Sequence, residues 1–443
     1  MNPSLFSHRQ QAIVVGASLG GLLTARVLSS HFARVTIIEK DPIHRQAESR
    51  KGQPQTRHLH ALLSSGVHIL LQYFPDLLND IVQQGGQVID FANAMDWYAY
   101  GGFKKRFVIG LDGVLISRPL LEHLIRERVL AIPNIQLLDQ TTVTQVIASA
   151  DQQKVTGVVI QQKENERALS LTADLVVDAA GRGSQTPQWL KAIGYETVPV
   201  SEVGINVGYT TRIYERDPDD ARGKSWMGCT PQAPQERRFG GVIPIEGNRW
   251  IVTVGGWHGD HAPREEKRYL EFVKSLPNPN IYAIVSTCAP LSPLIHYKFP
   301  VSNRRHYEKL SRFPAGYLVL GDAVSSFNPI YAQGMSSACL QAAALDNVLQ
   351  ENSTAERLFK SYFKRVARIV DNIWLIATGE DFRYPETTGP RPPGINIINK
   401  YVVRVHRASV RDEVVGTALL KVLALLQPPA TLFHPKILWR VLS

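Results

Sequence analysis

The alternation of hydrophobic and polar residues near the start of the chain predicts a strand, a tight turn, a helix and a second strand. Residues 12–15 form a short apolar run, residues 22–30 carry the apolar spacing of a helix, and residues 34–38 form a second apolar run. Short apolar runs are typical of strands in a parallel sheet, because both faces of such a sheet are buried. The segment therefore predicts a βαβ unit.

The middle of the chain is rich in strand patterns. Apolar or alternating runs at 143–147, 155–161 and 169–171 predict a small meander, and another buried strand is expected at 175–178. From about residue 195 to residue 300, strand patterns dominate. This part predicts a separate domain rich in β-sheet.

Mixed α/β character returns after that part. An apolar run at 318–320 predicts a buried strand, and a helical pattern follows at 336–349. The remainder is helical in pattern, with a proline-containing break at 385–393. The predicted fold class is α/β: a Rossmann-type domain assembled from discontinuous segments, with an inserted β-sheet domain and a helical C-terminal region.

Composition excludes several classes of protein. The chain has 443 residues, of which 44% are hydrophobic and 20% charged, so it can bury a sizeable core and is not a disordered chain. The formal net charge of +10 suits a nucleic acid, an anionic membrane surface, an acidic ligand or simply a basic soluble protein. No Lys/Arg block interleaved with aromatic residues and no zinc-finger spacing occurs, so nucleic-acid binding is not expected.

The cysteines and the apolar runs predict a cytoplasmic protein. Cys229, Cys288 and Cys339 are far apart and form no CxxC or Cys/His metal motif, which favours reduced thiols. Residues 1–11 lack the apolar stretch of a signal peptide. No uninterrupted apolar run reaches the ~18 residues of a membrane span.

The first candidate for chemistry is the turn Gly16-Ala17-Ser18-Leu19-Gly20-Gly21. Gly16 permits a tight turn, small residues after it let the backbone approach a pyrophosphate, and the helix N-terminus offers N–H groups and a positive dipole. Ser18 stands at the middle glycine of the GxGxxG pattern. Glu39 ends the second strand about 20 residues later, where a carboxylate can bind ribose hydroxyls. This context favours a dinucleotide site over a tight βα turn without a ligand.

Two further motifs follow predicted strands. Gly321-Asp322-Ala323 comes after the run at 318–320, with Asn328-Pro329 and Gln333-Gly334-Met335 downstream. An acidic residue at a strand end can bind a ribityl hydroxyl, and the next helix can direct its N-terminus at the polar edge of a flavin. Taken alone, Asp322 could equally be a helix N-cap. The third motif is Asp178-Ala179-Ala180-Gly181-Arg182-Gly183-Ser184, which could also be an ordinary strand-to-helix turn.

In this order and at these separations, the three motifs resemble those of the class A flavin monooxygenases, the family with the para-hydroxybenzoate hydroxylase fold. The resemblance covers roughly residues 10–345. It implies FAD as cofactor, NAD(P)H as a transient reductant, O2 as co-substrate and a C4a-hydroperoxyflavin as the oxidant. It also implies four segments: the first part of the FAD-binding domain (10–194, with substrate-domain elements near 85–115), a β-sheet substrate domain (195–305), the second part of the FAD-binding domain (306–350) and a C-terminal helical region (351–443).

The resemblance also implies the cofactor ligands. The pyrophosphate turn would comprise Gly16, Ser18, Gly20 and Gly21. The adenosine would be held by Glu39 and Lys40 at the ribose and by the backbone of Val143 at the adenine. Arg118, at the start of a predicted helix, would reach the cofactor, and the residues beside the flavin would be Asp322, Gly334 and Met335.

A narrower similarity is to the squalene-epoxidase-like polyene epoxidases of polyether pathways, such as the lasalocid epoxidase. It is carried by residues 50–60 (RKGQPQTRHLH), 248–254 (NRWIVTV) and 321–335. It implies that Arg50 lies near FAD and that the substrate is lipophilic. The usual Asp-Gly pair of the third motif is Ala180-Gly181 here, so the way the protein meets NAD(P)H, directly or through a separate flavin reductase, stays open.

The expected function is an FAD-dependent oxidoreductase that epoxidises or hydroxylates a lipophilic alkene, terpenoid or aromatic natural product. The alternative is an FAD-dependent prenyl reductase or dehydrogenase, similar to the geranylgeranyl reductases, which inserts no oxygen. The Trp-x-Trp-x-Ile-Pro signature of flavin halogenases is absent from the sequence. No catalytic side chain and no metal ligand is assigned, because a flavin can itself supply the oxidant.

Three features allow two interpretations each. His58 and His60 could be ligands of a metal or a flavin tether, or polar groups packed near the cofactor; two histidines are too few for a metal site. Tyr209, Trp226 and Trp257 line the substrate side of the sheet or belong to the core. Residues 395–442 mix basic and aliphatic residues at helical spacing, which predicts either helices packed on the body or an amphipathic element that contacts a membrane.

Overall fold

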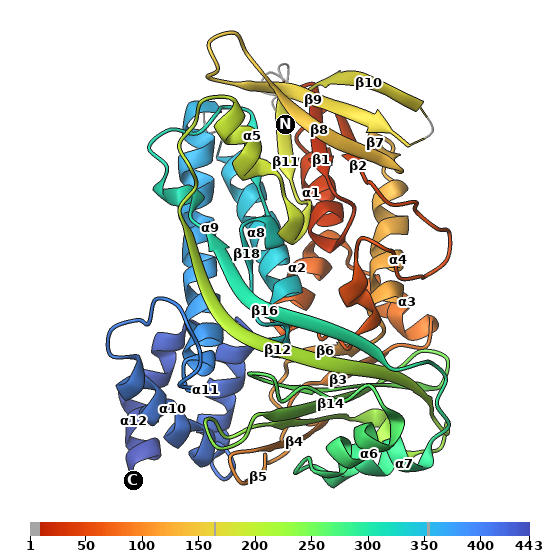
Figure 1. The fold of residues 1–443 in the computed structure, drawn as a ribbon, viewed down its shortest axis with the longest axis vertical. Coiled ribbons are helices and arrows are strands. Elements are labelled where there is room, and N and C mark those ends of the chain that lie inside the picture. Colours follow the sequence, from red (N-terminus) through yellow and green to blue (C-terminus); the bar gives the residue numbers. More distant parts are fainter. Residues whose placement is uncertain (1–8, 164, 352–354) are drawn as a thin grey trace.

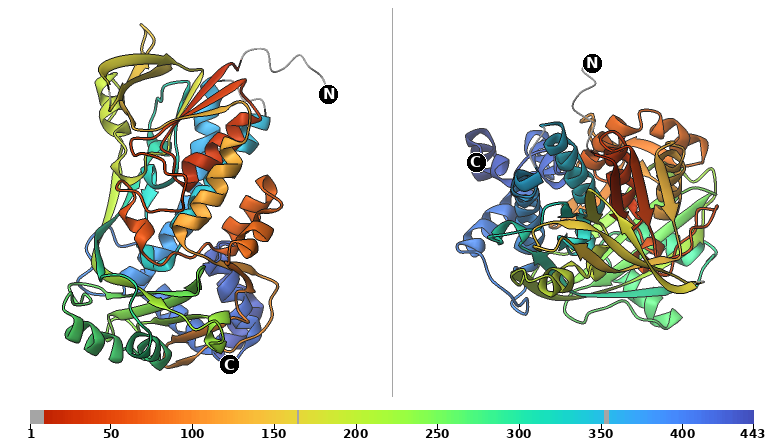
Figure 2. Two further views of the ribbon diagram at one scale, coloured as in Figure 1. Left: turned by 90° about the vertical axis from the view of Figure 1, so that its right-hand side faces the viewer. Right: turned by 90° about the horizontal axis from the view of Figure 1, so that it is seen from above.

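The computed structural model describes residues 9–163, 165–351 and 355–443. Residues 1–8, considered above for a signal peptide, and 352–354, near the start of the predicted C-terminal region, lie outside the described residues. Figures 1 and 2 show an elongated molecule with a parallel sheet towards one end and a large mixed sheet at the other. Long helices run alongside and connect the two ends (Figure 1).

The parallel sheet has five strands in the order β17-β11-β1-β2-β7, and every pairing is parallel. Its strands are β1 (Gln11–Val15), β2 (Arg34–Ile38), β7 (Ile135–Leu138), β11 (Leu175–Asp178) and β17 (Tyr317–Val319). Strands from residue 11 and from residue 317 thus belong to one sheet. This arrangement confirms the predicted Rossmann-type domain assembled from discontinuous segments.

Helices pack against this sheet and against one another. The longer ones are α1 (Leu19–Ser29), α4 (Arg118–Leu130), α8 (Gly334–Gln350) and α9 (Ala355–Asp381), and the shorter ones are α2 (Ser64–Tyr73), α3 (Leu77–Gln83) and α5 (Thr186–Ala192). Helix α1 contacts β1 and β2, and α8 contacts α1, α2 and α9. The predicted meander is a three-stranded antiparallel sheet that lies over the upper end in Figure 1. Its strands are β8 (Thr141–Ala148), β9 (Val155–Gln162) and β10 (Asn165–Thr172).

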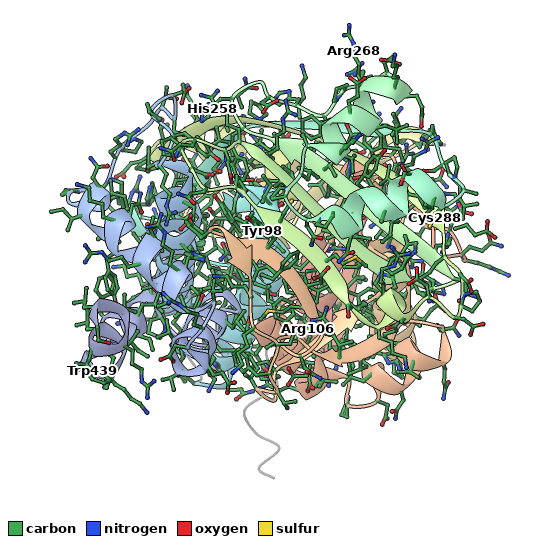
Figure 3. All side chains as sticks on the ribbon, turned by 90° about the horizontal axis from the view of Figure 1, so that it is seen from below. Tyr98, Arg106, His258, Arg268, Cys288 and Trp439 are labelled. Atoms are coloured by element: carbon green, nitrogen blue, oxygen red, sulfur yellow. The ribbon has the colours of Figure 1, made fainter. Side chains whose placement is uncertain are left out.

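The large sheet has eight strands in the order β18-β16-β12-β15-β14-β13-β4-β5. The central strands are β12 (Val200–Glu215), β13 (Trp226–Thr230), β14 (Arg238–Ile245), β15 (Arg249–Gly256) and β16 (Ile295–Arg305), and the outer ones are β4 (Met95–Ala99), β5 (Gly102–Phe103) and β18 (Ser325–Ser326). Helices α6 (Glu266–Lys274) and α7 (Pro279–Thr287) lie across its outer face in Figure 3. The strands β3 (Gln87–Asp90) and β6 (Asp112–Leu115) form a separate pair.

The C-terminal helices pack beside the large sheet. They are α10 (Ile395–Ala408), α11 (Glu413–Leu423) and α12 (Pro435–Leu442), with a 3-10 turn at Pro429–Phe433. Helices α10 and α11, this turn and the end of α9 line an apolar cavity of about 280 Å³. Figure 3 shows Trp439 projecting from these helices at the edge of the molecule.

The predicted start of the first helix was wrong. Helix α1 begins at Leu19 rather than at residue 22, so Gly20 and Gly21 lie in its first turn. Glycine pairs favour turns in isolation, but here a Cβ at Gly20 would lie 3.2 Å from Leu320 Cδ2 and 3.3 Å from Ala338 Cβ. Close packing of α1 on α8 therefore overrides the local preference. The residue boundaries of the predicted domains remain predictions.

Candidate functional site

The turn between β1 and α1 contains glycines where a side chain has no room. Gly16 has a φ of +103°, and a Cβ there would lie 2.7 Å from the carbonyl oxygen of Ala179. A Cβ at Gly21 would lie 1.9 Å from the carbonyl oxygen of Gly16. The absence of side chains lets the strand, the turn and the helix approach one another, with the N-terminus of α1 at the turn. Such an N-terminus favours an anion such as a pyrophosphate.

Glu39 closes one side of this turn. The residue is only 6% exposed. Oε2 accepts a hydrogen bond from the Ala17 N–H at 2.8 Å, and Oε1 accepts one from the Asp41 N–H at 3.0 Å. Its neighbour Lys40 is exposed, and Lys40 Cε lies 2.9 Å from where a Cβ of Gly52 would be. Glu39 is thus buried against the turn while Lys40 is exposed, and their contact with a ribose remains a prediction.

Arg50 reaches the same turn from the loop after β2. Its Nη1 lies 2.9 Å from Glu39 Oε2, its Nη2 lies 2.7 Å from Glu122 Oε1, and Nη2 also donates to the carbonyl oxygen of Ala17 at 2.9 Å. Arg50 thus lies beside the glycine turn, and its contact with FAD remains a prediction.

Arg118 meets the other oxygen of Glu122. Ser117 is the N-cap of α4, and its hydroxyl accepts a hydrogen bond from the Leu120 N–H, so Arg118 is the first helical residue. Arg118 Nη2 lies 3.1 Å from Glu122 Oε2 and donates to the hydroxyl of Ser18 at 3.2 Å. Ser18 in turn donates to Glu122 at 3.3 Å. Glu122 joins both arginines to the turn and was not among the residues predicted from the sequence.

The charges of this cluster balance. Burial alone would raise the pKa of the Glu122 carboxyl, but Arg118 and Arg50 outweigh that effect and hold its pKa below the usual value. Burial would also lower the pKa of Arg50, yet Glu122 and Glu39 raise it. Glu122 and Arg50 therefore form an ionised pair near neutral pH. Two guanidinium groups beside a glycine turn and a helix N-terminus are the donors that suit a pyrophosphate.

The second motif lies close to this cluster. Asp322 sits in a 3-10 turn directly after β17, and the backbone N–H of Gly321 donates to Gln341 Oε1 at 2.8 Å, which ties the turn to α8. The N-cap of α8 is Gln333, so Asp322 is not a helix N-cap. Burial raises the pKa of the Asp322 carboxyl, and the charges of Arg118 and Arg182 oppose that shift. Asp322 therefore feels the charges of one cation at the start of α4 and one in the third motif.

Gly334 and Met335 open helix α8 beside Asp322. A Cβ at Gly334 would lie 3.8 Å from Asp322 Oδ1, whereas the side chain of Met335 is buried in the core. Strand β8 passes the opposite end of the turn: the Thr141 N–H donates to the carbonyl oxygen of Glu39 at 2.9 Å, and Val143 follows two residues later. Strand β8 thus runs beside Glu39, and Gly334 lies beside Asp322.

Asp178, in the third motif, stabilises its own turn. It is buried, and its carboxylate accepts hydrogen bonds from the Ala180 N–H at 2.8 Å and from the hydroxyls of Ser184 and Thr186. It therefore does not take the place of the family's missing aspartate as a ligand. Arg182 lies on the other side of the turn, with its guanidinium carbon 4.6 Å from the centre of the Phe299 ring.

His58 and His60 are packed as polar groups close to this site. His58 Nδ1 lies 2.7 Å from the Thr211 hydroxyl, and burial lowers the pKa of His58 to about 3. Burial and the charge of Arg118 lower the pKa of His60 to about 4. Both imidazoles are therefore neutral near pH 7. Within the described ranges, no group of three or more His, Cys, Asp and Glu side chains could hold a metal ion.

The three aromatic residues singled out from the sequence separate into two places. Tyr209 and Trp257 belong to one buried cluster, against which Ile330 and Tyr331 pack from the segment before α8. Trp226 packs in another cluster and stacks on Phe91, with ring centres 4.9 Å apart. Only Tyr209 and Trp257 are therefore placed towards the second motif.

Comparison with known proteins decides the family. A family model described as an FAD binding domain matches residues 9–374. The chain belongs to this FAD-binding family. It is an FAD-dependent oxidoreductase, and NAD(P)H is the reductant typical of such enzymes. Bound FAD supplies two-electron redox chemistry and, when reduced, reactivity towards O2. The residues at the glycine turn fit such a group, since the close-packed turn, the helix N-terminus and the two arginines all favour a pyrophosphate.

Relatives of this FAD-dependent oxidoreductase include Protein Rv3254 of Mycobacterium tuberculosis, which is 31% identical over 402 residues that cover 87% of this chain and 83% of the relative. Among solved structures, PqsL of Pseudomonas aeruginosa has a TM-score of 0.60 at 19% identity and covers 84% of this chain and 97% of its own. The flavin-dependent brominase Bmp2 has a TM-score of 0.66 at 14% identity, with coverage of 97% and 96%.

The p-nitrophenol 4-monooxygenase PnpA of Pseudomonas putida has a TM-score of 0.65 at 16% identity and covers 95% of this chain and 99% of its own. These structures show the fold, which is that of the class A flavin monooxygenases. The predicted fold class, cofactor and enzyme class are thus confirmed. In the parts of the chain that the structure describes, every helix is too short or too polar to cross a membrane.

Proposed function

We propose that this enzyme inserts one oxygen atom of O2 into a lipophilic alkene, terpenoid or aromatic substrate by epoxidation or hydroxylation. NAD(P)H supplies two electrons, the second oxygen atom leaves as water, and the substrate gains one oxygen. The narrower similarity to polyene epoxidases enters here as support for a lipophilic substrate. In this proposal FAD is held by the cofactor ligands predicted from the sequence, together with Glu122 and Arg182.

One observation carries the proposal. The inner face of the large sheet carries a cluster of apolar and aromatic side chains where it meets the segment before α8. Buried side chains of this cluster include Val207, Tyr209, Phe239 and Phe299 on the strands and Trp257 directly after β15. The half-buried Tyr297, Ile330 and Tyr331 pack against them. A site with few water-accessible polar groups favours a lipophilic substrate and protects a reactive flavin from water.

In this reaction the residues of the protein bind the cofactor and exclude water. Glu39, Arg50, Arg118 and Asp322 orient the cofactor, while the apolar face excludes water from the acceptor. The phenol of Tyr209 keeps its proton, because burial raises its pKa far above the ordinary value. No acid or base is required at the oxygen transfer.

The test follows the flavin and the oxygen separately. The FAD-loaded protein is reduced without air by NADH or NADPH and mixed with O2 in the presence of candidate terpenoid, polyene and aromatic compounds. We expect a transient absorbance that differs from those of oxidised and reduced flavin. We also expect a product that carries label from isotope-labelled O2 but not from labelled water. Direct reoxidation with a product that has only gained or lost hydrogen would support the reductase instead. Failure of both nicotinamides to reduce the flavin would point to a separate reductase.

We also propose that residues 395–442 contact a membrane surface from which a lipophilic substrate enters. Exposed apolar side chains support this: Ile397 is 76% exposed and Trp439 70% exposed, with Lys436 and Arg440 beside Trp439. Sedimentation with anionic vesicles tests it, since the proposal expects binding that weakens in the Ile397→Ser/Trp439→Ser variant. Binding of the wild type to neither anionic nor neutral vesicles would contradict it.

A further inference from the structure

A buried carboxyl group from the C-terminal region lies beneath the segment that leads into α8. Asp381 is the last residue of α9 and is 0% exposed. Its Oδ1 accepts three hydrogen bonds: from Trp257 Nε1 at 3.0 Å, from Asn328 Nδ2 at 2.8 Å and from the Tyr331 hydroxyl at 2.9 Å. Trp257 comes directly after β15 of the large sheet, and Asn328 and Tyr331 come before α8. One carboxyl group therefore joins three separate parts of the molecule.

The two oxygens of this carboxyl differ sharply. Oδ2 is buried and has no hydrogen-bond partner among the described residues, while Oδ1 holds all three donors. The neighbouring charged residues, Glu380 and Arg383, pair with each other at 2.9 Å. Buried acids usually have a cationic partner, since an unpaired buried charge is costly. Asp381 is held by neutral donors instead, which marks it as more than a packing residue.

We propose that Asp381 is a positioning residue of the flavin site, whose carboxyl group fixes Asn328 and Tyr331, and through them segment 328–333, more firmly when ionised than when protonated. The inference rests on the proposed function, because it takes Gly334 and Met335 to lie beside the flavin. Gly334 follows segment 328–333 directly, so a change in how this segment is held would reach the flavin first.

The chemistry of the carboxyl group supports two states near neutral pH. Burial raises the pKa of Asp381 to about 7, although Trp257, Asn328 and Tyr331 act to lower it. Above that pH the charged Oδ1 binds its donors strongly, because hydrogen bonds to an ionised acceptor are stronger. Below it a proton occupies the carboxyl group, the acceptor is neutral, and the segment is held less firmly.

Few other groups near Asp381 can change charge in that range. Burial raises the pKa values of Tyr331 and Tyr384, which stay protonated. Burial lowers the pKa of His258, which reaches Asp381 through Thr387: His258 Nε2 lies 3.0 Å from the Thr387 hydroxyl, and that hydroxyl donates to the Asp381 carbonyl oxygen at 2.7 Å. The other charged groups around this network include Glu380, Arg383 and Arg237. Glu386 pairs with Arg237 and acts on His258, and Arg391 donates to the carbonyl oxygens of Phe382 and Tyr384. Glu380, the residue next to Asp381 in the chain, is the competing carboxyl group.

The test uses the full-length FAD-loaded protein and the visible absorbance of the bound flavin, with no turnover required. The pH is varied from about 5.5 to about 8.5, a range that brackets a carboxyl pKa of about 7. The wild type is expected to show one spectral transition with a midpoint near pH 7. In Asp381→Asn this transition is absent, and the matched control Asp371→Asn, on the same helix but 60% exposed, keeps it.

A second variant keeps the test decisive if Asp381→Asn does not fold. Trp257→Phe removes one hydrogen-bond donor from Asp381 Oδ1, which destabilises the ionised carboxyl group. The midpoint of the spectral transition is therefore expected to rise by about one pH unit. A merely structural role would lower the melting temperature and leave the midpoint unchanged. A wild type with no transition, a transition that persists in Asp381→Asn, or one that is lost in Glu380→Gln would overturn the proposal. These outcomes do not depend on oxygen insertion, so they are distinct from failure of the proposed reaction.

Discussion

Glu122 Oε1 lies 2.7 Å from Arg50 Nη2, although the two residues are 72 positions apart and their side chains are only 4% and 3% exposed. The other oxygen of Glu122 binds Arg118, so one carboxylate compensates two buried cations. This pair joins the loop after β2 to the start of α4 at the glycine turn.

Replacement of Glu122 is expected to be severe. Glu122→Gln leaves Arg50 and Arg118 without their shared negative charge, and removal of one partner from a buried ion pair typically costs about 3 to 5 kcal/mol. Urea unfolding would measure this loss, and the FAD content after purification should fall with it. Glu127→Gln on the same helix is the control, because the Glu127 side chain is 61% exposed and its loss should change stability by about 0.5 kcal/mol or less. A loss below about 1 kcal/mol in Glu122→Gln would show that the pair is not a structural necessity.

The close approach of α1 to the turn makes a second prediction. Gly21→Ala would place a Cβ 1.9 Å from the Gly16 carbonyl oxygen, so the helix must move away from the turn. We expect destabilisation of about 1 to 3 kcal/mol or more and loss of bound FAD, seen by thermal unfolding and by the ratio of flavin to protein absorbance. Gly183→Ala is the matched control, because no atom lies within 4 Å of its added Cβ. Equal melting temperatures for the two variants would refute this explanation of Gly21.

The elements around the site could be predicted from the sequence because their signals are local. A short apolar run marks each strand of the parallel sheet, and the strand before Asp322 was found from residues 318–320 in this way. The glycine turn and Glu39 were placed from spacing alone. Helix α1 was the exception, because contacts of Gly20 with Leu320 and Ala338, far away in the sequence, decide where it begins.

Glu122 and Asp381 were not predicted, because their roles depend on contacts between residues far apart in the sequence. Glu122 lies four residues after Arg118, and this helical spacing could have revealed the pair. Its burial, however, depends on Arg50, which comes from a loop without periodicity. Asp381 had no such signal, since its donors Trp257 and Asn328 lie 124 and 53 residues away.

A third prediction concerns the reactivity of the three cysteine thiols. Burial raises the pKa values of Cys229 and Cys339 to about 12, whereas Cys288 is partly exposed. Because the thiolate is the reactive form, a thiol reagent near pH 8 should modify Cys288 alone in the native protein and all three cysteines in denaturant. Cys288→Ser should then show no rapid reaction. Rapid modification of two or more thiols in the native wild type would mean that the core opens readily at Cys229 or Cys339.

The buried imidazole of His58 makes stability depend on pH in a defined direction. Burial lowers the pKa of His58 to about 3, so the folded state keeps it neutral while the unfolded chain binds a proton below its ordinary value of 6.5. The stability contribution is therefore complete above pH 6.5 and is lost as the pH falls towards 3. Between pH 7 and pH 5 the loss from this one group is about 2 kcal/mol.

In His58→Gln, where an amide can still bond Thr211, urea unfolding should show a pH-dependent loss of stability that is smaller by about that amount. His60, whose pKa is lowered to about 4, still contributes in this variant. The exposed His68 provides the control, and His68→Gln should lose as much stability as the wild type. If His58→Gln and the wild type lose equal stability, the proton is taken up elsewhere and His58 is not held neutral by its burial against the large sheet.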